Sequence, residues 1–124
     1  MHRRDTGESR GIDRNEFVTR AIETLDEIQS QLFDRALKHR QENTTRIDSL
    51  DEFRQYFTPQ NPEQPEIHGG FALCHWCEDP EVEKVLDELK VTIRCVPFDE
   101  PEESGTCIFT GKPSSKRAVF GKSY

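Results

Sequence analysis

An apolar stripe with a spacing of three and four residues runs from Asp13 to Asn43, and no glycine or proline interrupts it. This spacing is typical of an amphipathic helix. Asp13 as N-cap, with Glu16 three residues later, resembles a capping box and predicts where the helix begins. At about 1.5 Å per residue the helix would be roughly 40 Å long, which exceeds what one domain needs to cover its own core. We therefore expect part of the stripe to face another domain or subunit. The stripe consists of Phe17, Ala21, Ile22, Leu25, Ile28, Leu32, Phe33, Ala36 and Leu37.

The chain as a whole is short and poor in apolar residues. Its 124 residues leave room for one domain, or for a small domain and an arm, and only 32% of them are hydrophobic. We therefore expect a folded part with a thin core beside solvated stretches. The opening segment 1–11 has no hydrophobic periodicity and, taken alone, would be a flexible lead-in.

Two further helices are predicted from their first residues. Ser49 followed by Glu52 begins one of them, and this helix stops by Pro59. Asp79 followed by Pro80 begins the other, because proline fits the first turn of a helix. Between the two, residues 58–66 contain three prolines and predict an extended linker.

Short runs rich in β-branched and aromatic residues predict the strands. They are an edge strand over Thr44–Ile47, a strand through Ile67, Phe71 and Leu73, and strands over Val91–Val96, Thr106–Phe109 and Arg117–Phe120, with a turn through Gly111, Pro113 and Ser114 before the last. Gly69 and Gly70 permit a bulge or a close backbone contact at the second strand. The order of elements predicts an α+β fold: a long N-terminal helix followed by a two-layer domain, with helices on one face of a mixed sheet.

The net charge of −7 argues against binding nucleic acid by general electrostatics. The last twenty-one residues nevertheless carry four basic groups and no acidic one, which predicts either a basic tail or a solvated final hairpin. No stretch is long and apolar enough to span a membrane, and the N-terminus lacks the apolar run of a signal peptide. We therefore expect a cytoplasmic protein, in which the four cysteines are free thiols or metal ligands rather than disulfides.

The segment Cys74-His75-Trp76-Cys77 is the sharpest local motif. Two thiolates separated by two residues can bind one tetrahedral Zn²⁺, but a complete site requires two more ligands. Cys95 and Cys107 are candidates, although they lie twelve residues apart and Thr110 stands where a second Cys-x-x-Cys would close. The cysteines are therefore either zinc ligands or partly buried thiols of a knuckle that once bound metal.

Other chemistry at this motif has weaker support. His68 and His75 flank it and would complete a mixed site, and Trp76 is expected to be a packing anchor. A redox role is disfavoured because Glu78 and Asp79 place negative charge beside Cys77, which opposes thiolate formation. The chain has no phosphate-binding loop, nucleophile elbow or zinc-protease helix motif, so the residues alone complete no active site.

Several runs resemble the C-terminal end of prolyl-tRNA synthetase, in the form that carries a zinc-binding-like domain after the anticodon-binding domain. The resemblance covers nearly the whole chain. It rests on Thr92-Ile-Arg-Cys-Val-Pro97, Gly105-Thr-Cys-Ile-Phe-Thr-Gly-Lys-Pro113 and Val119-Phe-Gly-Lys-Ser-Tyr124, and upstream on Arg3-Arg-Asp-Thr-Gly-Glu8, Ile28-Gln-Ser-Gln-Leu-Phe33 and Arg40-Gln-Glu-Asn43.

The resemblance implies three regions. Residues 1–12 would be a remnant of the anticodon-binding domain, 13–43 a linker helix, and 44–124 the C-terminal domain, with a two-layer fold similar to translation initiation factor three. The family's enzyme joins proline to tRNA(Pro) with ATP and Mg²⁺ and works as a homodimer. Its class II catalytic domain would lie outside this chain, so no catalytic residue is carried over.

The resemblance also implies site residues. The family's zinc site uses two cysteine pairs: Cys77 matches the end of the first pair, Cys74 its start with shortened spacing, and Cys107 the start of the second, while Thr110 replaces its end. Cys95 does not correspond to a ligand position of the family, so only its residue type makes it a candidate for the fourth ligand. The terminal carboxylate of Tyr124 would pack toward the catalytic domain.

We therefore predict the C-terminal structural portion of a proline–tRNA ligase. Its partners would be the catalytic and anticodon-binding domains, with tRNA(Pro) contacted only indirectly. ATP and Mg²⁺ would act only through the catalytic domain. The alternative is a free-standing zinc-binding or protein-interaction module derived from the same domain.

Overall fold

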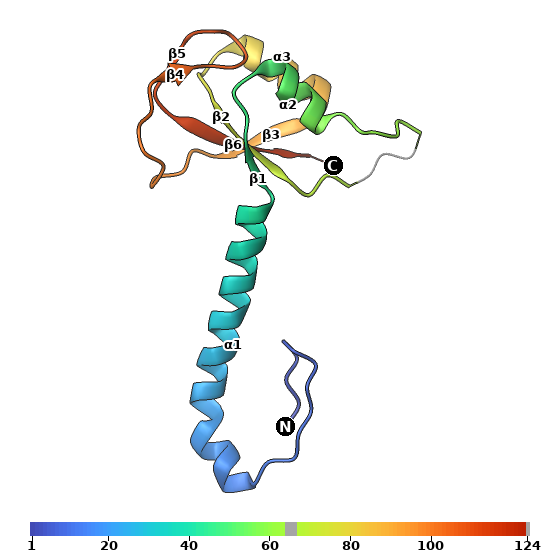
Figure 1. Cartoon of the computed structure of the whole chain (residues 1–124), viewed down its shortest axis with the longest axis vertical. Coiled ribbons are helices and arrows are strands. Elements are labelled where there is room, and N and C mark those ends of the chain that lie inside the picture. Colours follow the sequence, from blue (N-terminus) through green and yellow to red (C-terminus); the bar gives the residue numbers. More distant parts are fainter. Residues whose placement is uncertain (64–66, 124) are drawn as a thin grey trace. The chain divides into compact units, whose positions relative to one another are not determined.

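The computed structural model describes residues 1–63 and 67–123, and these form two compact units, Met1–Glu42 and Asn43–Tyr124. The first unit holds helix α1 (Arg14–Glu42) and the second holds all the other helices and strands (Figure 1).

Helix α1 confirms the predicted long amphipathic helix. Its 29 residues correspond to a length of about 43 Å. The carboxylate of Asp13 accepts a hydrogen bond from the backbone N–H of Asn15 at 2.8 Å, which caps the first turn as predicted. No residue of α1 is buried, and within the apolar stripe Ile22 and Leu25 are 74% and 64% exposed. The helix therefore presents an apolar face that the described residues leave open to solvent.

The opening segment is ordered by its own hydrogen bonds rather than by a hydrophobic core. His2 and Ser9 form an isolated antiparallel bridge, and the N–H of Arg3 donates to the carbonyl of Glu8 at 2.8 Å. Gly7 closes the turn between these strand-like arms with a φ of 76°, in the left-handed region that glycine adopts readily. Residues 1–10 thus form a small hairpin-like segment.

The second unit is built on a mixed sheet of four strands in the order β1-β2-β6-β3. The strands are β1 (Thr44–Arg46), β2 (Phe71–His75), β6 (Arg117–Lys122) and β3 (Val91–Cys95). β1 runs parallel to β2, whereas β6 is antiparallel to both β2 and β3. The predicted edge strand, the mixed sheet and the α+β class are confirmed.

Helices α2 (Leu50–Phe57) and α3 (Pro80–Leu89) cover one face of this sheet (Figure 1). Each begins where its capping residue predicts: Ser49 accepts from the N–H of Glu52 at 3.3 Å, and Asp79 from the N–H of Glu81 at 3.0 Å. The core between helices and sheet packs phenylalanine rings against aliphatic and small side chains. It is formed by Phe53 and Phe57 of α2, Val82 and Leu86 of α3, Ala72 and Cys74 of β2, and Ala118 and Phe120 of β6.

The strand predicted over Thr106–Phe109 is wrong beyond Thr106. A short strand β4 (Gly105–Thr106) pairs with β5 (Pro113–Ser114) in a separate two-stranded sheet, so Pro113 and Ser114 are not in the turn either. The intervening residues form a turn in which the N–H of Gly111 donates to the carbonyl of Cys107 at 2.8 Å. Gly111 has a φ of 73°, and this turn geometry overrides the strand propensity of the apolar residues before it.

The second strand begins later than its apolar pattern predicts. Ile67 lies outside β2 and is 84% exposed, and the strand starts at Phe71. The predicted close backbone contact is present at Gly70, where a Cβ would overlap the Tyr56 hydroxyl. Of the predicted linker, residues 64–66 lie outside the described part of the chain.

Candidate functional site

Two of the predicted ligand cysteines meet at the junction of β2 and α3. Cys77 follows β2, and Cys107 and Thr110 belong to the turn after β4. The Cys77 sulfur lies 3.2 Å from the Thr110 hydroxyl oxygen, in the same turn as Cys107. We call Cys77, Cys107 and Thr110 the cysteine knuckle.

The turn that carries half of the knuckle is held against the end of β2 by its backbone. The N–H of Ile108 donates to the carbonyl of His75 at 3.2 Å, and the N–H of Cys107 donates to the carbonyl of Lys112 at 2.8 Å. An ion pair between Lys112 and Asp79 joins the same turn to the N-cap of α3. The knuckle is therefore fixed by contacts that do not involve its sulfur atoms.

The two thiols of the knuckle differ in acidity. Burial raises the pKa of Cys107, but hydrogen bonds from the Thr110 hydroxyl, the Phe109 N–H and the Cys77 thiol outweigh burial, so the net shift is downward. The Thr110 hydroxyl favours the thiolate of Cys77 too, yet burial and the nearby Cys107 and Asp79 leave its pKa raised.

The other two cysteines lie elsewhere. Cys74 is fully buried on the sheet face that packs against α2 and α3, opposite Ala118, and burial raises the pKa of its thiol to about 12. Cys95 is exposed at the end of β3. A strand alternates its side chains between faces, which explains why Cys74 belongs to the core while Cys77, beyond the strand end, faces the turn.

The histidines near the motif have other partners. His75 is buried, with Nδ1 3.4 Å from the Ser114 hydroxyl and Nε2 3.9 Å from a Glu103 carboxylate oxygen. His68 packs against Tyr56, with ring centroids 4.5 Å apart. Trp76 packs against the core, as predicted.

These residues do not fit a closed structural zinc site. The knuckle supplies two thiols and one hydroxyl, whereas structural zinc sites use four Cys or His ligands. Among the described residues, no group of three or more His, Cys, Asp or Glu side chains is arranged to hold a metal ion. Tyr124, whose carboxylate was expected to face a catalytic domain, lies outside the described residues.

A buried arginine on the other face of the sheet is a feature that sequence reasoning missed. Arg117 is 5% exposed, and its guanidinium pairs with Asp48 at 2.7 Å and with Glu103 at 3.0 Å. The Arg117 Nε–H donates a hydrogen bond to the Glu103 carboxylate, and this bond lowers the pKa of that carboxyl. The pairing ties the acidic loop before β4 to the sheet. The position of Arg117 at the start of an apolar strand is the sequence feature that could have indicated its burial.

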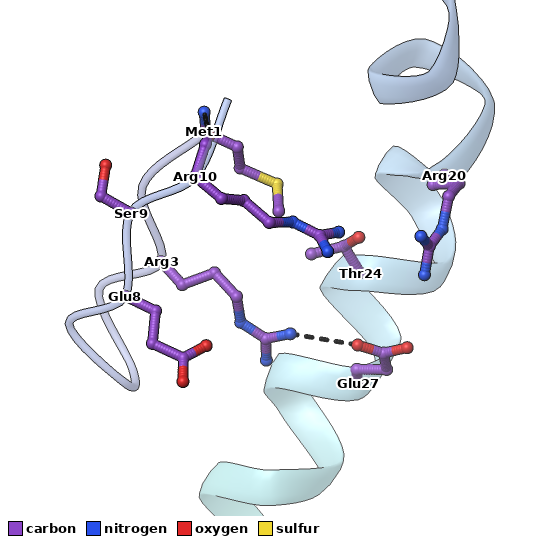
Figure 2. A pocket seen from close by; sticks show the side chains of 8 residues that line it. All are labelled: Met1, Arg3, Glu8, Ser9, Arg10, Arg20, Thr24 and Glu27. Carbon is purple, nitrogen blue, oxygen red and sulfur yellow. Dashed lines mark hydrogen bonds and ion pairs between the residues drawn. The ribbon is translucent and has the colours of Figure 1, made fainter. Parts of the chain in front are cut away.

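A cleft of about 430 Å³ lies within the first unit (Figure 2). The Arg3 guanidinium points across it to Glu27 at 3.1 Å and also pairs with Asp5 at 2.8 Å, so its charge is balanced locally. The lining mixes both signs of charge and contains no thiol or histidine; it comprises Met1, Arg3, Glu8, Ser9, Arg10, Arg20, Thr24 and Glu27. Its two carboxylates, Glu8 and Glu27, belong to no group of three or more metal-ligating side chains among the described residues.

A family model described as "Prolyl-tRNA synthetase, C-terminal" matches residues 63–124, which is half of the chain. The chain belongs to the prolyl-tRNA synthetase family. The resemblance seen in the sequence motifs is thereby confirmed, and the matched region contains the whole cysteine knuckle.

Relatives of this family match the chain over almost its full length. The chain is 46% identical to a proline–tRNA ligase of Rhodopirellula baltica over 98% of the chain, and 42% identical to one of Protochlamydia amoebophila over 91%. A second proline–tRNA ligase of Anaeromyxobacter dehalogenans is 47% identical over the whole chain. The chain spans about a quarter of the length of these relatives, 24%, 22% and 26% respectively.

Proposed function

We propose that this chain serves in the attachment of proline to tRNA(Pro) as the C-terminal structural part of a prolyl-tRNA synthetase. Its role is to stabilise and position the rest of the enzyme. The observation that carries the proposal is α1: a helix of 29 residues with no buried residue and a continuous apolar stripe. An apolar face of this extent favours burial against other protein.

We assign roles to the parts of the chain from its resemblance to the family. Residues 1–12 would complete the anticodon-binding domain, 13–43 would be the linker helix, and 44–124 the C-terminal domain. Proline activation, with ATP and Mg²⁺, and the contacts with tRNA(Pro) would belong to the other domains of a homodimeric enzyme in the cytoplasm. No helix among the described residues has the length and apolarity needed to cross a bilayer.

The second unit supports a structural role for the chain. Its known chemistry-bearing groups are used internally: Arg117 is neutralised by Asp48 and Glu103, and His75 is buried beside Ser114. The cysteine knuckle is held by hydrogen bonds of its own turn. These contacts hold the domain together, and the Ser114 hydroxyl beside His75 donates instead to the carbonyls of Trp76 and Lys116, at 2.8 and 2.9 Å.

The test uses the chain with a separately produced catalytic and anticodon-binding portion from the same enzyme. The chain alone should show no proline-dependent exchange of pyrophosphate into ATP, and adding it should raise aminoacylation by the other portion several-fold. Exchange activity in the pure chain, or no gain on addition, would contradict the proposal.

A pair of matched variants tests the role of the apolar stripe. Ile22→Lys with Leu25→Lys places two charges on the stripe, and we expect the gain in aminoacylation to be lost. Ser30→Lys with Gln41→Lys adds the same charge on the opposite side of the helix, where both residues are exposed, and should keep the gain. If both double variants lose the gain in aminoacylation, or both keep it, the apolar stripe is not the surface that acts on the rest of the enzyme.

The alternative is a free-standing module that binds zinc or another protein. The observation that favours it is the compact fold of residues 43–124, which has its own core. This alternative would be supported if the chain unfolded at the same temperature with and without the catalytic portion, and if the two did not associate in sedimentation.

A further inference from the structure

Phe98 is the most exposed large apolar side chain among the described residues, with a relative exposure of 107%. It lies in residues 96–104, between β3 and β4, which we call the acidic loop because this segment holds four acidic residues and no basic one. The whole aromatic ring is therefore in contact with water, which the hydrophobic effect disfavours. A surface that covered the ring would remove this contact.

The acidic loop is held in place on both sides of Phe98. Before the ring, Val96 packs against the core of the second unit. After it, Glu100 forms an ion pair with Arg46 of β1, and the N–H of Glu103 donates at 3.0 Å to a backbone carbonyl between β5 and β6. A proline precedes Phe98 and another follows it by three positions, and both restrict the backbone. Binding through this loop would therefore require little further ordering of the chain.

The four carboxylates of the acidic loop are used in different ways. Glu100 and Glu103 pair with arginines of the sheet. Asp99 forms no ion pair with any described residue, and the side chain of Glu102 is 76% exposed, with its paired ammonium 3.9 Å away. Asp99 and Glu102 thus leave negative charge near Phe98 that a partner could neutralise.

This charge restricts the class of partner. Nucleic acid and anionic lipid would be repelled by the carboxylates. A second copy of the chain would bring the same acidic loop and the same net charge of −7. A protein surface with an apolar pocket and a rim of lysine or arginine fits both features, because the ring fills the pocket and the carboxylates pair with the rim.

We propose that the acidic loop is a docking element: Phe98 inserts into an apolar pocket of another protein surface, and Asp99 and Glu102 pair with cations at the rim of that pocket. The chain spans about a quarter of the length of its relatives, so we assign the pocket to the remaining part of the enzyme. In this assignment the inference rests on the proposed function. It adds a contact on the second unit to the one made by the apolar stripe of α1.

The experiment measures the Kd between the full chain and the separately produced catalytic and anticodon-binding portion, by isothermal titration calorimetry. Phe98→Ala should raise the Kd about tenfold or more, because it removes the ring that fills the pocket. The matched control is Ile67→Ala, which truncates an apolar side chain that is 84% exposed on the same unit. It should change the Kd by less than about twofold. Far-ultraviolet circular dichroism checks that both variants keep the fold.

A second pair of variants tests the carboxylates. Asp99→Lys with Glu102→Lys should weaken binding about tenfold at about 0.1 M NaCl and less at about 1 M, because salt screens the attraction to the rim. Glu83→Lys with Asp87→Lys makes the same change in net charge at exposed positions of α3 and should have a much smaller effect at both salt concentrations.

The outcomes separate this inference from the proposed function. If the parent chain binds but Phe98→Ala and Ile67→Ala have equal Kd values, the inference is overturned and the proposed function stands. If the parent chain does not bind, both are overturned. Sedimentation of the chain alone, and with phosphatidylcholine–phosphatidylserine vesicles, tests other occupants. Self-association or vesicle binding that Phe98→Ala abolishes would also overturn the inference.

Discussion

The Nζ of Lys122 donates a hydrogen bond to the carbonyl oxygen of Leu89 at 2.8 Å, at the C-terminal end of α3. The same ammonium group donates to the carbonyl of Phe57 at 2.9 Å, at the C-terminal end of α2. One cation on the last strand therefore serves the ends of both helices that cover the sheet, where unpaired carbonyls and the helix dipoles favour positive charge.

Replacing this lysine should destabilise the domain. We expect Lys122→Met to lower the free energy of unfolding by about 1–3 kcal/mol, because two carbonyls lose a charged donor. Urea unfolding followed by circular dichroism measures the change. Lys116→Met is the matched control, since Lys116 is exposed and pairs only at 3.9 Å with Glu102; it should cost less than about 0.5 kcal/mol. Equal losses in the two variants would contradict the assigned role.

The Arg117–Glu103 contact should make stability depend on pH. The pKa of Glu103 is lowered from its ordinary value of 4.5, chiefly by the hydrogen bond from Arg117. A carboxyl with a depressed pKa in the folded state stabilises the fold above its unfolded pKa, and this stability is lost as pH falls through the folded pKa. The urea midpoint should therefore drop as pH falls below about 4.5.

Substitution isolates the contribution of that carboxyl. Glu103→Gln should flatten the acid side of the profile, because the amide does not titrate. Glu102→Gln changes the neighbouring residue, whose side chain is 76% exposed, and should leave the slope as in the parent chain. A parent-like slope in Glu103→Gln would show that other acidic groups, such as Asp79, dominate.

Gly70 should not tolerate a side chain. A Cβ there would overlap the Tyr56 hydroxyl and stand 3.3 Å from the carbonyl oxygen of Asn43. We expect Gly70→Ala to destabilise the chain by about 1–3 kcal/mol, as overpacking does. Gly69→Ala is the control, since a Cβ at that position meets no atom within 4 Å.

A second substitution distinguishes a clash from a general loss of flexibility. Tyr56→Phe removes the hydroxyl that a Cβ at Gly70 would overlap, so the double variant should recover part of the stability lost in Gly70→Ala. Urea midpoints of the four proteins form a double-mutant cycle. Strict additivity would contradict the steric explanation.

The cysteine knuckle should retain little zinc. With two thiols and the Thr110 hydroxyl, it supplies half of a closed tetrahedral set, so protein purified without added metal should contain well below one zinc per chain. Thr110→Cys adds a third sulfur at the knuckle and should raise zinc content, measured by elemental analysis. Thr106→Cys adds a thiol on β4 instead and should not. Equal zinc in both variants would contradict the assignment of Thr110 to this site.

Local features of the fold were predictable because their causes are local. The stripe of α1, the caps Ser49 and Asp79, and the β-branched run that begins β3 depend on residues within a few positions of one another. The mixed α+β class followed from the order of these elements, and the family followed from short runs such as Gly105–Pro113. The turn after Thr106 was missed because its geometry depends on pairing with β5.

The amino-acid sequence by itself determined which segments are helices, where those helices begin, and which family the chain belongs to. Tertiary structure alone decided how the cysteines are grouped. The alternation of β2 places Cys74 in the core, and the packing of a distant turn brings Cys107 and Thr110 to Cys77. It also buried Arg117, because only the folded sheet brings Asp48 and Glu103 to its guanidinium. Contacts between residues far apart in the chain depend on the packing of whole elements, which local sequence patterns do not specify.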